Sequence, residues 1–303
     1  MREKGFADSA AGAGQDVCLR NTGKAGRTVS AMERIREILS TEEEDVRPYF
    51  RLTDAQMRAK QRPGEAIFIA EGPKVVRTAL ERGLKPLSFL MRRKMIEGAG
   101  ADILAMSPDT PVYTGDDGIL EAVTGFKLQR SWVLSAMARP EEKTAEEVLR
   151  GARRVAVLEG IWEPSNVGAI FRTAAALGWD AILLSPDCSD PWHRRSVRVC
   201  MGAVFTVPWA WTGEEKGFPE LRAEGFTTLG MALREDSVPP DEPSLRKTER
   251  LAVFLGNEDH GLKEATLRGC RRVIRIPMAR EIDSLNVAAA AAIALWELRP
   301  GRK

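Results

Sequence analysis

The sequence predicts an α/β protein whose C-terminal part is a doubly wound parallel sheet, preceded by a smaller α/β domain. The chain has 303 residues, more than one typical domain needs. Short, continuous apolar runs alternate with helical stretches, and such runs are typical of strands buried on both faces of a parallel sheet. Polar motifs follow several of the runs, at the sheet edge where open α/β sheets place their ligands.

The first part of the chain divides into an arm and a small domain. Residues 1–31 are rich in Gly, Ala, Ser and charge without periodicity, so we expect a disordered or tag-like arm. Residues 32–138 are expected to hold a helix that begins at Met32 and runs to Leu39, and then a compact α/β domain. The expected strands of this domain are residues 66–70, 87–91, 111–113 and 132–134.

Two helices are expected between these strands. One covers residues 74–82, with Pro73 at its first position and Gly83 at its end, and the other covers 118–123. The polar residues 139–152 read as a linker that leads into a short helix.

Residues 153–303 are expected to form the second, larger domain. A buried strand at 155–158 precedes a helix at 167–177, which Gly178 ends, and an Ala-rich helix at 287–298 closes the domain. The remaining expected strands are residues 181–184, 204–208, 227–231, 251–255 and 273–276.

Composition excludes several classes of protein. The net charge of +2 is nearly neutral, so the overall composition does not by itself indicate a nucleic-acid partner. The four cysteines lack metal-ligand spacing and there are only two histidines, so no metal site is expected. No apolar run is long enough to span a membrane and the N-terminus lacks a signal peptide, so we expect a soluble, cytoplasmic protein.

Basic residues nevertheless gather locally. Such clusters are usually solvated surface, and they gain meaning only where they border a common cleft. The three clusters are Arg92 to Lys94; Arg194, Arg195 and Arg198; and Arg271, Arg272 and Arg275.

The first polar motif begins the helix after the strand at 155–158. Asn166 stands where an N-cap would be, so capping is its ordinary structural role. Gly168 and Arg172 share one helix face. Helical side chains lean towards the N-terminus, so Arg172 would lie over the turn of Gly168 and reach the helix mouth. The alternative is a surface arginine beside a packing glycine.

The second motif follows the strand at 251–255. Gly256 permits a tight turn and a close approach of backbone to a ligand. Glu258 is a carboxylate that could orient Arg172 or accept a ligand hydroxyl, although an ordinary loop acid is the alternative. His260 is interpreted as a surface residue.

The third motif joins the strand ending at Ile276 to the Ala-rich helix. Ser284 and Asn286 are both plausible caps for that helix. Their hydroxyl and amide could also bind a ligand beside the free backbone donors of the helix start.

Together these motifs resemble the SpoU (TrmH) family of RNA ribose 2′-O-methyltransferases, within the SPOUT superfamily. The resemblance covers 154–298 closely and 66–135 more loosely, and Glu163 departs from the aspartate that the family often has. The residues that carry it are Glu163, Pro164, Ser165, Asn166, Gly168, Arg172, the segment 196–203, Gly256, Asn257, Glu258, Gly261, Ile276, Pro277, Met278, Ser284, Leu285 and Asn286.

The resemblance implies a trefoil knot in the C-terminal domain, which ordinary rules of chain topology would exclude. It implies S-adenosyl-L-methionine as the cofactor, contacted by the backbone of Gly256, Ile276 and Leu285. It also implies a homodimer that completes the active site across its interface, and an N-terminal domain that binds the RNA substrate. The implied catalytic residues are Asn166, Arg172, Glu258, Ser284 and Asn286.

The implied reaction is the attack of a ribose 2′-hydroxyl on the cofactor methyl group. Arg172 is then either the base or a clamp that orients the hydroxyl and a phosphate, since a guanidinium rarely gives up its proton. The extra N-terminal domain favours ribosomal RNA over transfer RNA. The alternatives are a tRNA 2′-O-methyltransferase and a non-catalytic RNA-binding scaffold. The sequence lacks a complete dinucleotide fingerprint and a P-loop.

Overall fold

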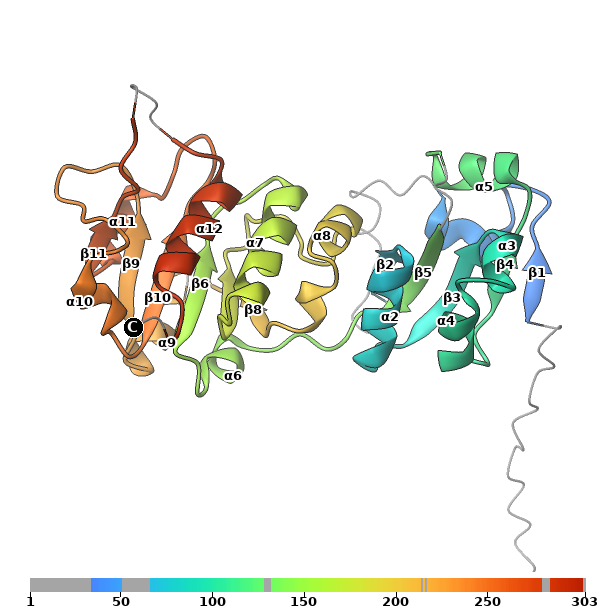
Figure 1. Ribbon diagram of the computed structural model, residues 1–303, viewed down its shortest axis with the longest axis horizontal. Coiled ribbons are helices and arrows are strands. Elements are labelled where there is room, and N and C mark those ends of the chain that lie inside the picture. Colours follow the sequence, from blue (N-terminus) through green and yellow to red (C-terminus); the bar gives the residue numbers. More distant parts are fainter. Residues whose placement is uncertain are drawn as a thin grey trace, which may run out of the picture.

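The computed structural model describes residues 34–50, 66–127, 132–213, 215, 217–279 and 284–301. The arm predicted over 1–31 lies outside these residues. Two sheets organise the described chain, one built before residue 139 and one after residue 153. Figure 1 shows them side by side along the long axis of the molecule.

The first sheet is mixed. Its strand order is β1-β4-β3-β5-β2, in which β1, β4 and β3 are parallel and β5 is antiparallel to both of its neighbours. Its strands are β1 (Ile35–Glu37), β2 (Ile67–Glu71), β3 (Pro86–Met91), β4 (Val112–Thr114) and β5 (Val133–Ala138). Its helical segments are η1 (Glu44–Tyr49), α2 (Pro73–Glu81), α3 (Arg93–Ile96), α4 (Ala101–Met106) and α5 (Asp117–Thr124).

The helix predicted to begin at Met32 is wrong. Residues 35–37 form strand β1, in register with Val112 to Thr114. The Ile38 N–H donates to the Thr114 carbonyl at 2.7 Å, and the Val112 N–H donates to the Arg34 carbonyl at 2.9 Å. Pairing with a distant strand overrides an eight-residue helical pattern, which is too short to be stable by itself.

The second sheet is parallel at every pair, as predicted, in the order β11-β9-β10-β6-β7-β8. Its strands are β6 (Arg154–Leu158), β7 (Ala181–Leu184), β8 (Trp209–Trp211), β9 (Thr227–Met231), β10 (Leu251–Leu255) and β11 (Arg272–Ile274). Its helical segments are α6 (Ala145–Leu149), α7 (Pro164–Ala176), α8 (Arg194–Val199), η2 (Ala203–Phe205), α9 (Phe218–Ala223), α10 (Pro243–Arg246), α11 (Glu264–Gly269) and α12 (Val287–Glu297).

Helices cover both faces of this sheet. Val155 and Val157 of β6 share a core cluster with residues of α6 and α9. The alternate residues Ala156 and Leu158 share the other cluster with residues of α7 and α12. Successive side chains of a strand point to opposite faces, so the continuous apolar runs reflect burial on both sides. Figure 1 shows α7 and α12 next to each other over one face.

The strand predicted at 204–208 is also wrong. Gly202 adopts a left-handed φ of 87°, and a short 3₁₀ turn follows over Ala203–Phe205. Pro208 cannot donate to a strand ladder, and the strand begins only after it, at Trp209. The segment is rich in apolar residues because the turn itself packs into the core, where Val204 and Val207 are buried.

Helix α8 and the segments on either side of it join the two sheets. Phe68 of β2 packs against Trp192 and Phe205, with ring centroids 4.8 Å and 5.6 Å away. Arg139 lies 2.8 Å from Asp190 in an ion pair whose side chains are both mostly buried. This packing fixes the first sheet beside the second. No helix in the described ranges is long and apolar enough to cross a membrane.

Candidate active site

A pocket of about 640 Å³ opens at the carboxyl ends of β9, β10 and β11, which form one side of the second sheet. Its walls come from three loops that follow β9, β10 and β11, together with the first turn of α12. Five residues predicted from the sequence line it: Gly256, Glu258, Ile276, Ser284 and Leu285. The topology therefore gathers motifs that are far apart in the sequence at one edge of the sheet, as expected for an open α/β sheet.

A chain of side-chain hydrogen bonds leads from this pocket to α7. Asn286 Nδ2 donates to Asn166 Oδ1 at 3.1 Å, and Asn166 Nδ2 donates to Glu258 Oε1 at 2.6 Å. The first of these three residues begins α12, the second lies in α7 and the third lies in the loop after β10. Three predicted catalytic residues are thus in direct contact.

The start of α7 differs from the capping predicted for it. Glu163, not Asn166, caps α7, and its carboxylate accepts from the Ser165 N–H at 3.3 Å. Hydrogen bonds from Ser165 hold the pKa of the Glu163 carboxyl below its usual range. Asn166 lies inside the first turn and is buried, so its amide is free to join Glu258 and Asn286. The early start of the helix follows from Pro164, which is suited to a first helical position.

Of the two caps predicted for α12, Ser284 and Asn286, it is Asn286 that caps the helix. Its Oδ1 accepts from the Ala288 and Ala289 N–H groups at 3.0 Å and 3.4 Å, while its Nδ2 serves the polar chain. Capping and participation in the site are therefore compatible roles for one amide. Ser284 is exposed and lines the pocket.

Both motif glycines are required by close packing of the chain against itself. A Cβ on Gly256 would lie 2.3 Å from both the Gly261 carbonyl carbon and the Leu262 nitrogen. A Cβ on Gly168 would lie 2.5 Å from the Ser196 carbonyl oxygen of α8. Gly256 precedes the tight turn, which covers residues 258–260, and its missing side chain admits the returning loop. Gly168 admits helix α8, and so its role is packing.

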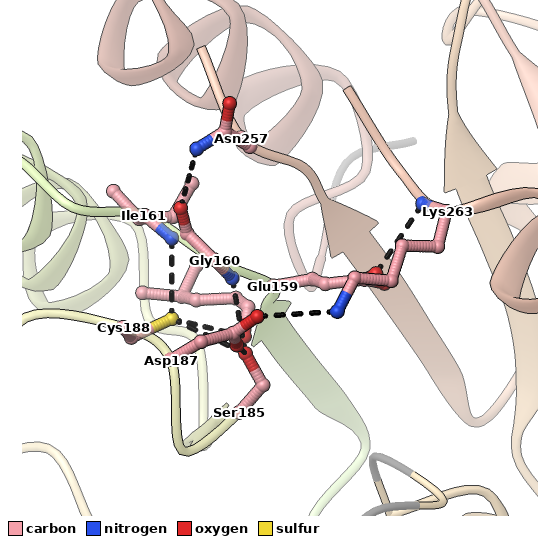
Figure 2. Close-up of polar contacts among 9 residues, drawn as sticks. Glu159, Gly160, Ile161, Ser185, Asp187, Cys188, Asn257 and Lys263 are labelled. Carbon is pink, nitrogen blue, oxygen red and sulfur yellow. Dashed lines mark hydrogen bonds and ion pairs between the residues drawn. The ribbon is translucent and has the colours of Figure 1, made fainter. Parts of the chain in front are cut away.

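Figure 2 shows the polar contacts that hold the loop after β10 against the loops after β6 and β7. Asn257 Nδ2 donates to the Gly160 carbonyl at 2.7 Å, and its Oδ1 accepts from the Asp259 and His260 N–H groups at 2.8 Å and 3.1 Å. The Lys263 N–H donates to Glu159 at 3.3 Å. Asn257 thereby sets the shape of the loop that presents Glu258.

Lys263 also reaches the loop after β7. Its Nζ lies 3.3 Å from Asp187 Oδ2, and the Ser185 hydroxyl donates to the other oxygen of the same carboxylate. Partial burial raises the pKa of Asp187, but the hydrogen bonds from Ser185 and Lys263 outweigh burial and leave the pKa below its usual range.

This lowered pKa predicts a pH dependence. Because the folded-state pKa lies below the unfolded value of about 3.9, the contribution of Asp187 to stability is present above that value and lost as the pH falls through the folded pKa. Urea unfolding of wild type and Asp187→Asn should differ by under about 1 kcal/mol near pH 7, since the pair is partly exposed. The difference should shrink below about pH 4. A difference that stayed constant with pH would contradict the assignment.

Arg172 stands apart from the other predicted residues. It lies on an exposed part of α7, and within the described residues it makes no side-chain hydrogen bond or ion pair and does not line the pocket. The sequence correctly places it on the helix that carries Asn166. A single chain does not bring its guanidinium to Glu258.

Sequence reasoning missed the loop that follows β9. Ala232, Leu233 and Arg234 all line the pocket. Their only signal was position, because they directly follow a predicted strand. No role is predicted for Asn257 from the sequence. Its position between Gly256 and Glu258 was the available signal that it organises this loop.

The pocket suits a nucleoside-containing cofactor such as S-adenosylmethionine. Leu233 and Leu285, which both line it, leave 53% and 39% of their surface exposed. Large exposed apolar side chains at a concave site indicate a ligand that covers them. Gly256 and Ile276 line the same pocket. The described residues include no cluster of His, Cys, Asp and Glu suited to a metal ion.

Comparison with known proteins gives consistent matches. Residues 153–296 match the SpoU rRNA Methylase family. A tRNA/rRNA methyltransferase of Mycobacterium tuberculosis, named as uncharacterized, is 38% identical over 239 residues, which cover 77% of this chain and 81% of that protein. A 23S rRNA (guanosine(2553)-2′-O)-methyltransferase of Bacillus subtilis is 26% identical and is matched over its whole length, with 88% of this chain covered.

Solved structures agree with these sequence matches. An AdoMet-bound rRNA methyltransferase from Sinorhizobium meliloti superposes with a TM-score of 0.74 and 26% identity, over 88% of this chain and 97% of that one. The family match covers the second sheet and all three site motifs, and the mycobacterial relative extends the similarity over most of both chains. The chain therefore belongs to the SpoU rRNA methylase family.

Proposed function

We propose that this protein transfers the methyl group of S-adenosylmethionine to a ribose 2′-hydroxyl of ribosomal RNA. The observation that carries the proposal is the hydrogen-bonded chain of Asn286, Asn166 and Glu258, which begins at a cofactor-sized pocket in a chain of the SpoU family. Relatives named as 23S rRNA 2′-O-methyltransferases support ribosomal RNA as the substrate class. The expected place of action is the cytoplasm.

The reaction forms a bond between the 2′-oxygen and the methyl carbon, while the carbon–sulfur bond breaks and its electron pair stays on sulfur. S-adenosylmethionine supplies an activated methyl group on a sulfonium, which is a good leaving group. The protein has to align the hydroxyl with this group and provide for loss of the hydroxyl proton. Gly256, Ile276 and Leu285 are proposed to hold the cofactor by their backbone groups.

Glu258 and Asn166 are proposed to orient the incoming ribose. Their contact at 2.6 Å fixes the carboxylate at the pocket wall, with Asn286 supporting the amide from the other side. Ser284 offers a hydroxyl on the same wall. A carboxylate held in this way can accept a hydrogen bond from a ribose hydroxyl without first reorganising.

The family resemblance also supports a division of labour within the chain. We propose that residues 153–303 form a methyltransferase domain with a trefoil knot, that 32–138 form a domain that binds RNA, and that 139–152 link them. In the described chain, the first and second sheets share no strand, which supports this division. The packing of α8 against β2 would hold the RNA-binding domain in a fixed place beside the site.

We further propose that the protein is a homodimer that uses the exposed face of α7 and α12. Ile293 and Trp296 of α12 leave 39% and 48% of their surface exposed, and α12 packs beside α7, the helix that carries Arg172. An apolar helix face of this kind indicates a partner. In such a dimer Arg172 would act in the pocket of the partner chain, which accounts for its distance from the pocket of its own chain.

A charge on this face should separate the subunits. Ile293→Glu is expected to convert a dimer into a monomer in light scattering after gel filtration, because it would bury an unpaired carboxylate. Leu39→Glu is the matched control, since Leu39 is 78% exposed and lies beside the first sheet. A dimer that persists in Ile293→Glu would contradict this interface.

The proposed activity is tested by transfer of radiolabelled methyl from S-adenosylmethionine to unmodified 23S rRNA transcripts. We expect label in the RNA with wild type and a large loss with Asn166→Ala, although calorimetry should still detect cofactor binding. Cofactor binding by wild type without transfer to ribosomal RNA would overturn the substrate assignment. Absence of cofactor binding by wild type would favour a non-catalytic scaffold.

A further inference from the structure

The three basic clusters found in the sequence have different surroundings in the structure. In the first, Arg92 and Arg93 pair with Asp117 and Glu37 at 2.8 Å and 2.7 Å. The arginines of the first cluster are thus matched by carboxylates and hold the first sheet together.

The second cluster lies on α8 and is matched in the same way. Arg194 and Arg198 lie 3.6 Å and 3.2 Å from the carboxylate of Glu71, and Arg195 lies 3.2 Å from Glu163. These arginines join α8 to β2 and to the start of α7. Neither this cluster nor the first offers an array of unmatched charge.

The third cluster is different. The sequence from 265 to 279 contains four arginines and no acidic residue. Across the described chain, Arg268, Arg271 and Arg275 are exposed and have no recorded carboxylate partner, while Arg272 donates to the Ser244 hydroxyl at 3.0 Å. In a chain whose net charge is only +2, this is a local concentration of unmatched positive charge.

These arginines surround a cavity next to the proposed active site. The cavity has a volume of about 320 Å³ and lies between α11, β11 and the segment after β9. It is lined by Arg234, Arg268, Arg271 and Arg272, together with Asp236, Val238, Leu267, Cys270 and Val273. Arg234 and Leu267 also line the active-site pocket, and so does Arg275. We name Arg234, Arg268, Arg271, Arg272 and Arg275 the β11 arginine surface.

The acidic groups nearby do not neutralise this surface. Asp236 and Glu264 both pair with Arg234, at 3.4 Å and 3.2 Å, and they fix its guanidinium between the two pockets. The other arginines keep their charge for a ligand. Cys270 is not a reactive thiol here, because burial raises its pKa to about 12 despite the surrounding arginines. Binding of an anion is the chemistry that these residues support.

We propose that the β11 arginine surface binds consecutive phosphates of the RNA strand that enters the methyl-transfer pocket. Guanidinium groups bind phosphate through paired N–H donors, and several along one edge can follow a nucleic-acid backbone without reading its sequence. The surface lies at the opposite end of the molecule from the first sheet (Figure 1). RNA held at both ends would pass across the active site, which suits a large structured RNA. This inference rests on the proposed function for its choice of ligand.

The test compares two double variants. Arg268→Gln with Arg271→Gln removes two exposed charges of the surface, and Arg150→Gln with Arg153→Gln removes two exposed arginines near the amino end of β6 that line neither the cavity nor the active-site pocket. Binding of unmodified 23S rRNA transcripts is measured by filter retention over a range of salt concentrations. Calorimetry with S-adenosylmethionine and thermal unfolding of each variant report cofactor binding and folding.

The surface variant should bind RNA on the order of tenfold more weakly, and the slope of log Kd against log salt should fall in magnitude by about 1 to 2. Its cofactor affinity should stay at the wild-type value, and the control variant should match wild type in both measurements. RNA binding and salt slope equal to wild type in the surface variant would overturn the inference. If wild type transfers no methyl group but the surface variant alone loses RNA binding, the surface is supported and the proposed reaction is not.

Discussion

Replacing Gly256 with alanine should abolish cofactor binding while leaving most of the fold intact. The added Cβ would lie 2.3 Å from the Gly261 carbonyl carbon and the Leu262 nitrogen, which are backbone atoms that cannot rotate away. The loop that carries Glu258 must therefore move, and its hydrogen bond to Asn166 at 2.6 Å cannot be kept. We expect at least a 100-fold loss of S-adenosylmethionine affinity by calorimetry, or about 2.7 kcal/mol.

The control for this variant is Gly118→Ala. A Cβ on Gly118 would meet no heavy atom within 4 Å, and this glycine lies inside helix α5, where alanine is favoured over glycine. Gly118→Ala should keep wild-type affinity and unfold at the same temperature or slightly above it. Wild-type cofactor affinity in Gly256→Ala would show that the loop after β10 does not form the cofactor site.

Arg172→Lys should lower kcat by at least about 100-fold, equivalent to about 2.7 kcal/mol in the activation barrier, with little change in cofactor affinity. Lysine keeps the positive charge but lacks the planar fork that binds a hydroxyl and a phosphate together. Cofactor affinity should be kept because Arg172 does not line the pocket of its own chain within the described residues. Methyl transfer and calorimetry on the same samples measure the two effects.

The pH–rate profile separates the two roles considered for Arg172. A clamp predicts a lower kcat with the same profile in the lysine variant. A base predicts that the activity of the lysine variant rises as its ammonium loses a proton, near pH 10 for an ordinary lysine. Full activity with an unchanged profile would contradict both roles. Arg150→Lys, at an exposed site away from the pocket, is the matched control and should behave as wild type.

The parts of the fold that the sequence predicts well are those with a local cause. The runs that form β6 and β10 are apolar because both faces of the sheet are covered, so their pattern alone indicates buried strands. Strand β1 has no such signal, since its pairing with Val112 to Thr114 is a contact between distant segments. The strand predicted at 204–208 is wrong for a related reason, because a packed turn can be as apolar as a strand.

The candidate site shows the same division. Position after a strand was enough to predict that Gly256, Ile276 and Ser284 meet at one edge. It was not enough to show that Asn166 lies within the first turn of its helix, since Glu163 and Pro164 start that helix earlier than the polar pattern suggests. The reason for Gly256 is likewise a contact with residues five and six positions away, which only the folded loop reveals.

Arg172 marks the limit of prediction from one chain. Its sequence neighbours place it on the correct helix, but it is exposed and lies outside the pocket of its own chain, so its proposed role depends on the proposed second subunit. The third basic cluster could not be distinguished from the other two by sequence. The structure distinguishes it, because among the described residues the arginines of the first two clusters form ion pairs with carboxylates and Arg271 and Arg275 do not.

The acceptor atom can be identified by digesting wild-type reaction products to nucleosides and locating the transferred methyl group by mass spectrometry. If the methyl group goes to a ribose oxygen of ribosomal RNA, we expect a single major nucleoside whose added mass lies on the sugar fragment, and none with Asn166→Ala. A methyl group on the base fragment, or no methylated nucleoside from ribosomal RNA with a wild-type protein that binds cofactor, would contradict this expectation.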